Sequence, residues 1–280
     1  TNGELTIKIY PSGQLGRGPV QQYKRVVEGV ADIVFGIQSY SPGLFPRTLL
    51  AHQPGVGRTS EEMTRKMWRK IQARHLAVEY TKVKLLFSVV HSPTVLIMKT
   101  KPVYSVADLK GMKIRIGSAL LSPLVKAWGG APVAMPITKV YNALSTGVVD
   151  GVLIQPSALF RPWKLAEPGK YVTTGFPSPG ALFFLAMNLD TWNSLTPSQQ
   201  RAIDSLSGET LSVKAARAYG GDDIVAIGKA RKGSQVQIID VSAEAAKGFA
   251  RGADIARELE FDRLAGKGID GRAIYADLMR

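Results

Sequence analysis

The chain has 280 residues and contains no cysteine, which excludes disulfide bonds, thiol catalysis and cysteine-ligated metals. This length is sufficient for one large or two modest domains, and a content of 45% hydrophobic and 21% charged residues is ordinary for a globular protein. The formal net charge of +14 is unusual, because a basic chain can bind nucleic acid, anionic lipid or small anions.

The densest group of positive residues lies in a segment that is predicted to form a helix from Ser60 onward. Its apolar residues recur at helical spacing, and its cations are expected on the opposite, solvated face: Met63, Met67 and Ile71 on one side, and Arg65, Lys66, Arg69, Lys70 and Arg74 on the other. The other positive residues are scattered, and no stacking-aromatic or recognition-helix motif accompanies them, so no nucleic-acid partner is predicted. No apolar run reaches the roughly 18 to 20 residues needed to span a bilayer.

The first third of the chain is predicted to form strands, one short helix and a long loop before the basic helix. Apolar and polar residues alternate over 5–10, which predicts a strand, and turn residues follow at 11–13. A helix is expected over 18–28 and an apolar strand over 31–36, which leaves through residues 37–40. Residues 41–58 hold three prolines and three glycines and are predicted to be mainly loop. Further strands are predicted over 82–90 and 94–99.

Residues 105–151 alternate short apolar strands with helices, which is typical of an α/β unit with a largely parallel sheet. Helices are expected over 106–110, 120–128 and 139–146, and strands over 112–116, 132–135 and 148–155. A helix over 157–165 and a strand over 182–188 follow. Thr196 and Pro197 are a helix start signal, and that helix is predicted to reach about residue 230 with an interruption near 207–208. A strand over 236–241 and helices over 243–264 and 270–279 complete the chain.

Arg115 is the first candidate for a binding residue. It stands at the carboxyl end of the predicted strand 112–116, which is the edge of a parallel sheet where ligands bind. Its guanidinium is a planar fork of fixed charge that matches a carboxylate. The alternative is a surface arginine that pairs with an aspartate of the same chain.

An ordered series of motifs in this chain resembles the solute-binding proteins of the tripartite ATP-independent periplasmic (TRAP) transporters. The central matches are the runs 108–115, 130–133, 135–136, 140–144 and 147–151, and the resemblance extends upstream to 10–16 and 28–33 and downstream to 163–165, 170–171, 187–188, Trp192 and 195–197. No single motif decides the matter, but the ordered series covers most of the chain up to about Gly208.

The resemblance implies a bilobal periplasmic-binding-protein fold, with two α/β lobes, a ligand cleft between them and hinge strands that cross from one to the other. Lobe I would hold residues 1–92 and 181–220, and lobe II residues 93–180 and 221–280. Members of this family usually have a further strand and helix ahead of the point that corresponds to Thr1, so we expect those elements to be missing from this sequence.

The resemblance also suggests which residues bind the ligand. Arg115 would clamp the carboxylate, and Gln155 stands before a proline where many members have asparagine. Gln38 and Tyr40 would face the cleft from the first lobe. The remaining cleft candidates are Trp163, Phe176, Ile137 and Pro93, and the alternative for the two aromatic residues is a place in the hydrophobic core.

The predicted function is capture of an organic carboxylate in the periplasm and its delivery to the membrane permease subunits of a TRAP transporter. The apolar run Val152-Leu153-Ile154, in place of the usual acidic-polar pair, suggests a monocarboxylate with an apolar or aromatic body. No catalytic residue, cofactor or metal is predicted, because the three histidines lack metal-ligand spacing and no nucleophile-elbow motif is present. The alternative is an enzyme on a bilobal α/β scaffold that acts on a small organic acid.

Overall fold

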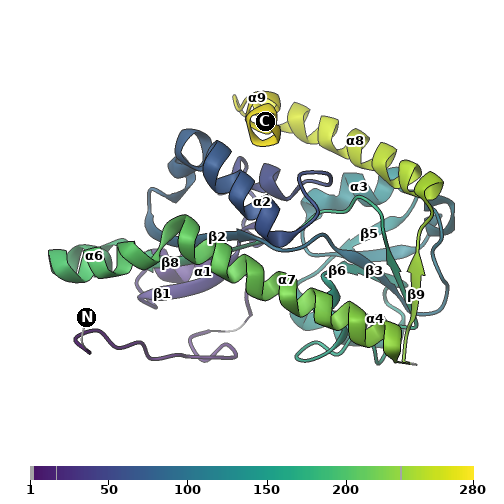
Figure 1. Ribbon diagram of the computed structural model, residues 1–280, viewed down its shortest axis with the longest axis horizontal. Helices are drawn as coiled ribbons and strands as arrows, with labels where there is room; N and C mark the ends of the chain where they lie inside the picture. The colour runs from purple at the N-terminus through teal and green to yellow at the C-terminus, as the bar shows by residue number, and fades with distance from the viewer. Residues whose placement is uncertain (1–2, 17, 234) are drawn as a thin grey trace.

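The computed structural model describes residues 3–16, 18–233 and 235–280, which form two separate β-sheets with helices packed around them (Figure 1). The first sheet has three strands in the order β1-β8-β2, with bounds Ile33–Ile37, Leu182–Asn188 and Val83–Val90. Both pairings are antiparallel, and β8 lies in the centre although it is the last of the three along the chain.

The second sheet has six strands in the order β5-β4-β6-β3-β7-β9. Their bounds are Ala131–Ala134 (β5), Lys113–Ile116 (β4), Gly151–Ile154 (β6), Val95–Met98 (β3), Tyr171–Thr174 (β7) and Gln237–Asp240 (β9). Three of its five pairings are parallel, and β3 is antiparallel to both of its neighbours. The predicted α/β architecture with two lobes is therefore confirmed, with one sheet in each lobe.

Helices cover both sheets. The α-helices are α1 (Gln22–Val27), α2 (Ser60–Lys66), α3 (Ser122–Ala127), α4 (Val140–Thr146), α5 (Leu189–Ser194), α6 (Pro197–Leu206), α7 (Gly208–Lys232), α8 (Ala243–Ala265) and α9 (Gly271–Met279). The shorter 3-10 helices are η1 (Gln38–Tyr40), η2 (Thr48–His52), η4 (Ala77–Tyr80), η5 (Val106–Leu109), η6 (Ala119–Leu121), η7 (Ile137–Lys139) and η8 (Pro156–Leu159), and η3 (Met67–Leu76) is of the π type. None of the described helices combines the length and apolar character that crossing a membrane requires.

Most predicted elements are present, and the exceptions have local causes. Residues 5–10 form no strand and lie outside both sheets, so their backbone lacks the neighbouring strand that would stabilise a β conformation. The helix expected over 157–165 is reduced to η8, because Pro162 cannot donate to a helix interior and also restricts the residue before it. The strand β7 was not predicted, although its β-branched residues favour one.

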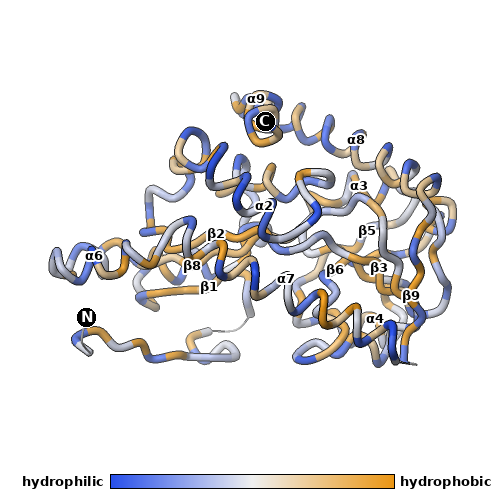
Figure 2. The backbone as a smooth tube through the Cα atoms, in the orientation of Figure 1, coloured by the Kyte–Doolittle hydropathy of each residue, from blue (hydrophilic) through white to orange (hydrophobic). Residues whose placement is uncertain are grey.

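Each sheet has its own core. In the first lobe, Phe45, Met67 and Phe184 belong to a cluster between the sheet and the surrounding helices. The second sheet is buried on both faces, with Val152 in the cluster on one face and Leu153 in the cluster on the other. Strand residues are accordingly mostly hydrophobic, while the exposed helices alternate in polarity (Figure 2).

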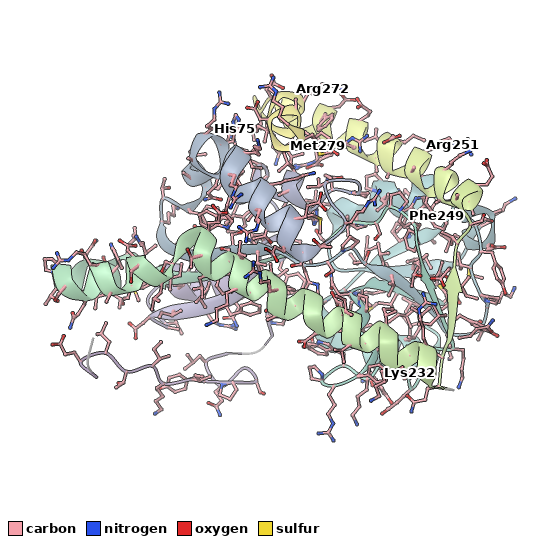
Figure 3. All side chains as sticks on the ribbon, viewed as in Figure 1. His75, Lys232, Phe249, Arg251, Arg272 and Met279 are labelled. Carbon is pink, nitrogen blue, oxygen red and sulfur yellow. The ribbon has the colours of Figure 1, made fainter. Side chains whose placement is uncertain are left out.

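Two long helices bridge the sheets (Figure 1). Helix α7 packs on β2 and α2 at one end and on η8 and β9 at the other. The first half of α8 joins the core of the second lobe through Phe249, whereas its end joins the first-lobe core through Phe261, together with Ile274 of α9. Figure 3 shows that Arg251 of α8 and Arg272 of α9 point outward. The lobe boundaries stay a prediction, and this packing would place α9 with the first lobe.

Candidate functional site

Arg115 is buried at the carboxyl end of β4, with 4% of its surface exposed. Its Nε and Nη2 atoms donate hydrogen bonds of 3.1 and 2.8 Å to the carbonyl oxygen of Met135, which directly follows the neighbouring strand β5. The backbone of the next strand thus fixes the orientation of the guanidinium. Two of its five N–H donors are used in this way, and the guanidinium also interacts with the hydroxyl of Tyr40.

The charge of Arg115 has no acidic partner among the described residues; its electrostatic neighbour is the phenol of Tyr40. Burial lowers the pKa of Arg115 to about 10, and the interaction with Tyr40 opposes this shift. The guanidinium is still protonated at neutral pH. A buried cation without an anion is costly, so this arrangement favours an incoming carboxylate.

Tyr40 connects the two lobes. It ends η1, which follows β1 in the first lobe, and its hydroxyl oxygen accepts a hydrogen bond of 3.1 Å from the backbone N–H of Ile137 in η7 of the second lobe. An oxygen that accepts in this way still has its own hydrogen to donate. Tyr40 therefore offers a donor beside Arg115 as well as a contact between lobes.

Gln38 lies in the same turn as Tyr40 but is fully buried within the first lobe. Its Nε2 atom donates to the hydroxyl of Tyr80 at 3.2 Å and to Oγ of Ser88 at 3.0 Å. Its Oε1 atom is buried without a hydrogen-bond partner among the described residues. These contacts anchor η1, and through it Tyr40, to β2 and η4.

Gln155 and Pro93 lie at the same edge of the second sheet as Arg115. Gln155 directly follows β6, which is parallel to β4, so both strands end at this edge. Pro93 precedes β3, and Val95 pairs with Ile154, which places the start of β3 beside the end of β6. Both Gln155 and Pro93 are half-buried.

The other three candidates differ in their surroundings. Ile137 is half-buried and takes part in the site through its backbone contact with Tyr40. Trp163 packs on the cluster at one face of the second sheet. Phe176 is 7% exposed and stacks on Phe249 with ring centroids 4.5 Å apart, within the cluster on the other face. The structure therefore brings Arg115, Tyr40 and Ile137 together, packs Phe176 into the lobe interior, and leaves Trp163 half-buried against the core of the second lobe.

A cavity of about 610 Å³ adjoins this group at the boundary between the lobes. Its walls come from the first part of the chain and from η7, and they include Leu15, Gly16, Gly18, Pro19, Val20, Gln21, Lys24, Arg25, Glu28, Val30, Pro136, Thr138 and Lys139. Arg115 is not among these lining residues. The cavity is thus a neighbour of the guanidinium and does not contain it.

The carbonyl of Met135 is the main site feature that sequence reasoning missed. A backbone oxygen gives no signal in residue type, although the pair Met135-Pro136 was among the motifs that carried the resemblance. Leu120 was missed as well, and it reaches from the second lobe to pack on the first-lobe core.

Comparison with known proteins places this arrangement in a family. Residues 1–254 match the family described as bacterial extracellular solute-binding protein, family 7 (DctP). The chain belongs to the DctP family. The recognition made from the ordered motifs is therefore confirmed.

Several members of known structure or sequence are similar to this chain. A solute-binding protein of Albidiferax ferrireducens is 28% identical over 233 residues, which are 80% of this chain and 66% of that protein. A TRAP solute-binding protein from a marine metagenome, specific for aromatic acid ligands and crystallised with 3-hydroxybenzoate, is 28% identical with a TM-score of 0.93. A TRAP solute-binding protein of Rhodoferax ferrireducens, with copurified benzoate, gives the same identity and TM-score. In both cases 99% of this chain and 87% of the other are covered.

The chain is shorter than its relatives of known sequence. It spans 66%, 63% and 62% of the length of three of them. The matched region nevertheless includes both sheets and all the residues gathered around Arg115.

Proposed function

We propose that this chain is a TRAP-type receptor that binds an organic monocarboxylate with an aromatic or apolar body and passes it to a membrane permease. The observation that carries the proposal is Arg115, a buried cation that is held by a backbone carbonyl and has no acidic partner among the described residues. A ligand carboxylate would supply the missing charge, with one oxygen also accepting from Tyr40.

The aromatic or apolar character of the ligand has two supports. Two similar structures hold benzoate and 3-hydroxybenzoate. In this chain, Ile137 and the apolar strand β6 lie near the guanidinium, although Leu153 and Ile154 of that strand are themselves buried in the lobe. Of Ile137, Leu153 and Ile154, only Ile137 stays half-exposed.

Among the described residues, no group of side chains supports the rival reading as an enzyme. His52 is buried in η2, His75 pairs with the partly buried Asp277, and His91 pairs with Asp223. The family and the similar structures are solute-binding proteins of transport systems. We therefore propose a periplasmic receptor that returns its ligand unchanged.

A thermal-shift screen tests the proposal. Benzoate, 3-hydroxybenzoate, succinate and a sugar acid would be added in turn, and the aromatic acids are expected to raise the melting temperature. A ligand that binds only the folded state stabilises that state by about 2.7 kcal/mol when its concentration is a hundred times Kd. Chromatography of the released ligand should recover it intact. Binding of succinate without binding of aromatic acids would contradict the ligand class, and turnover of the bound acid would contradict the receptor role.

A further inference from the structure

Several segments that link the lobes meet at one buried point. Residues 91–94 lead from β2 to β3, and residues 178–181 lead back toward β8. These two segments bond to each other, with His91 N–H donating to the Ala181 carbonyl at 2.7 Å and Thr94 N–H donating to the Pro179 carbonyl at 3.0 Å. Helix α7 runs past them and continues into the second lobe (Figure 1).

Asp223 of α7 lies at this junction, with only 5% of its surface exposed. Its Oδ1 atom accepts a hydrogen bond of 2.9 Å from the backbone N–H of Ser157 in η8. Its Oδ2 atom is 3.2 Å from Nδ1 of His91, which is 3% exposed. One buried carboxylate thus contacts the segment that leaves β2 and the turn that follows β6.

The carboxylate of Asp223 is close to the ring of His91, but the geometry is not that of a hydrogen bond. The two atoms are within ion-pair distance, yet they are not aligned as a hydrogen bond, and neither has another hydrogen-bond partner among the described residues. His91 is enclosed by the rings of Phe183 and Tyr219, with centroids 5.6 and 4.7 Å away. Burial acts to raise the pKa of Asp223, but the interactions with His91, Ser157 and Ser92 outweigh it and lower the pKa, so the carboxylate is charged.

The bond to Ser157 reaches the candidate ligand site through the chain. Gln155 lies two residues before Ser157 and precedes η8, at the sheet edge that also carries Arg115. We propose that Asp223 is a positioning residue that couples the angle between the lobes to the turn at Gln155. This role rests on the proposed function in so far as Gln155 faces the ligand.

The coupling has a physical basis in the placement of the groups. Asp223 belongs to α7 and His91 to the segment that crosses between the lobes, so a change in the angle between the lobes would change the distance and alignment of the pair. The carboxylate transmits this change to the N–H of Ser157. The ligand-binding turn therefore responds to lobe rotation although Asp223 is not itself a ligand contact in this scheme.

The test compares three variants: Asp223→Ala, Asp223→Asn and Asp222→Ala. Asp222 is the adjacent, exposed residue of the same helix and serves as the matched control. Asparagine keeps an oxygen acceptor for Ser157, whereas alanine removes it.

Circular dichroism first shows that each variant is folded, and calorimetry then measures the affinity for benzoate. We expect Asp223→Ala to bind about 10-fold more weakly, because the acceptor for the Ser157 N–H is lost, while Asp223→Asn, which keeps an acceptor, and Asp222→Ala stay within about threefold of the unaltered chain.

Amide hydrogen exchange of the peptide that contains residues 152–160 gives a second readout that needs no ligand. Exchange there should accelerate in Asp223→Ala and stay slow in Asp223→Asn and Asp222→Ala. Unchanged exchange in Asp223→Ala overturns the proposal, as does an equal loss of benzoate affinity in the alanine and asparagine variants. If the unaltered chain does not bind benzoate, the proposed ligand class fails, and the exchange experiment alone decides the role of Asp223.

Discussion

Arg115 is expected to contribute more than any other single residue to the affinity for a carboxylate ligand. Its replacement by alanine would remove a charge-assisted pair from a desolvated position, which costs on the order of 2–5 kcal/mol, or about 30-fold or more in Kd. Lysine should restore binding only in part, because a point charge does not reproduce the planar fork. Calorimetry with benzoate measures both variants.

The control for this prediction is Lys113→Ala, which removes an exposed cation from the same strand. It should leave the affinity unchanged. Unaltered affinity of Arg115→Ala, together with a large drop in its melting temperature, would show that Arg115 serves the fold and not the ligand.

Tyr40 contributes through its hydroxyl group alone. Tyr40→Phe keeps the ring but removes the acceptor for the Ile137 N–H and the donor expected to face the carboxylate. We expect the Kd for benzoate to rise about 10-fold, since one or two hydrogen bonds at a buried boundary are lost. Tyr104→Phe, which alters an exposed tyrosine, is the matched control. Equal affinities of the two variants would remove Tyr40 from the site.

His52 is expected to make the free energy of unfolding depend on pH. Burial lowers its pKa from 6.5 to about 4 in the folded state, so below pH 6.5 the unfolded chain binds a proton that the folded chain does not. The contribution is fully present above pH 6.5 and is lost as the pH falls toward 4, and the loss of stability at pH 5 is about 2 kcal/mol. Urea unfolding at pH 7.5 and pH 5 should show that His52→Leu loses less stability on acidification than the unaltered chain. Parallel losses would contradict this assignment.

At the scale of elements, α8 packs against α3 through a glycine. A methyl group on Gly252 would lie 2.4 Å from Cδ1 of Trp128, whose indole nitrogen donates to the Phe249 carbonyl at 3.0 Å. Gly252→Ala is therefore expected to destabilise the protein by about 1–3 kcal/mol in urea unfolding, because the core is overpacked. Gly221→Ala in α7, which meets nothing within 4 Å, should instead be neutral or stabilising. The reverse order would contradict the packing described for α8.

Elements with strong local signals could be predicted from the sequence. Thr196 and Pro197 begin α6 with a capping box, and α6 and α7 are separate at Ser207, near the predicted interruption. The strand predicted over 5–10 failed for a non-local reason, because a strand needs a neighbour that local alternation does not reveal.

The position of Arg115 at the carboxyl end of a strand could be predicted from the sequence, and its role in the site stays a prediction. Gln38 and Tyr40 were both expected to face the cleft, because they follow the end of a predicted strand. They lie in a 3-10 helix with three residues per turn, so their side chains point in different directions, and only Tyr40 reaches the second lobe. The packing of Phe176 on Phe249 joins residues far apart in sequence, which no local pattern could indicate.

At the scale of the whole molecule, the net charge of +14 should attract an anionic ligand. Long-range attraction raises the association rate and is screened by salt, whereas the short-range contacts around Arg115 are largely protected. Stopped-flow measurements with benzoate should therefore show an association rate constant that falls by up to about 10-fold when the salt concentration is raised from 20 mM to 500 mM. The dissociation rate constant should change little. A salt effect confined to dissociation would contradict steering by the net charge.

The central position of β8 in the first sheet sets an order for folding during synthesis. β1 and β2 touch β8 and not each other, so this sheet cannot form until residue 188 has left the ribosome. Strands β3 to β7 of the second sheet, in contrast, occupy the continuous stretch 95–174 and are complete earlier. We expect the middle of the nascent chain to fold first, while the apolar segments of residues 33–90 stay exposed to chaperones until β8 joins them.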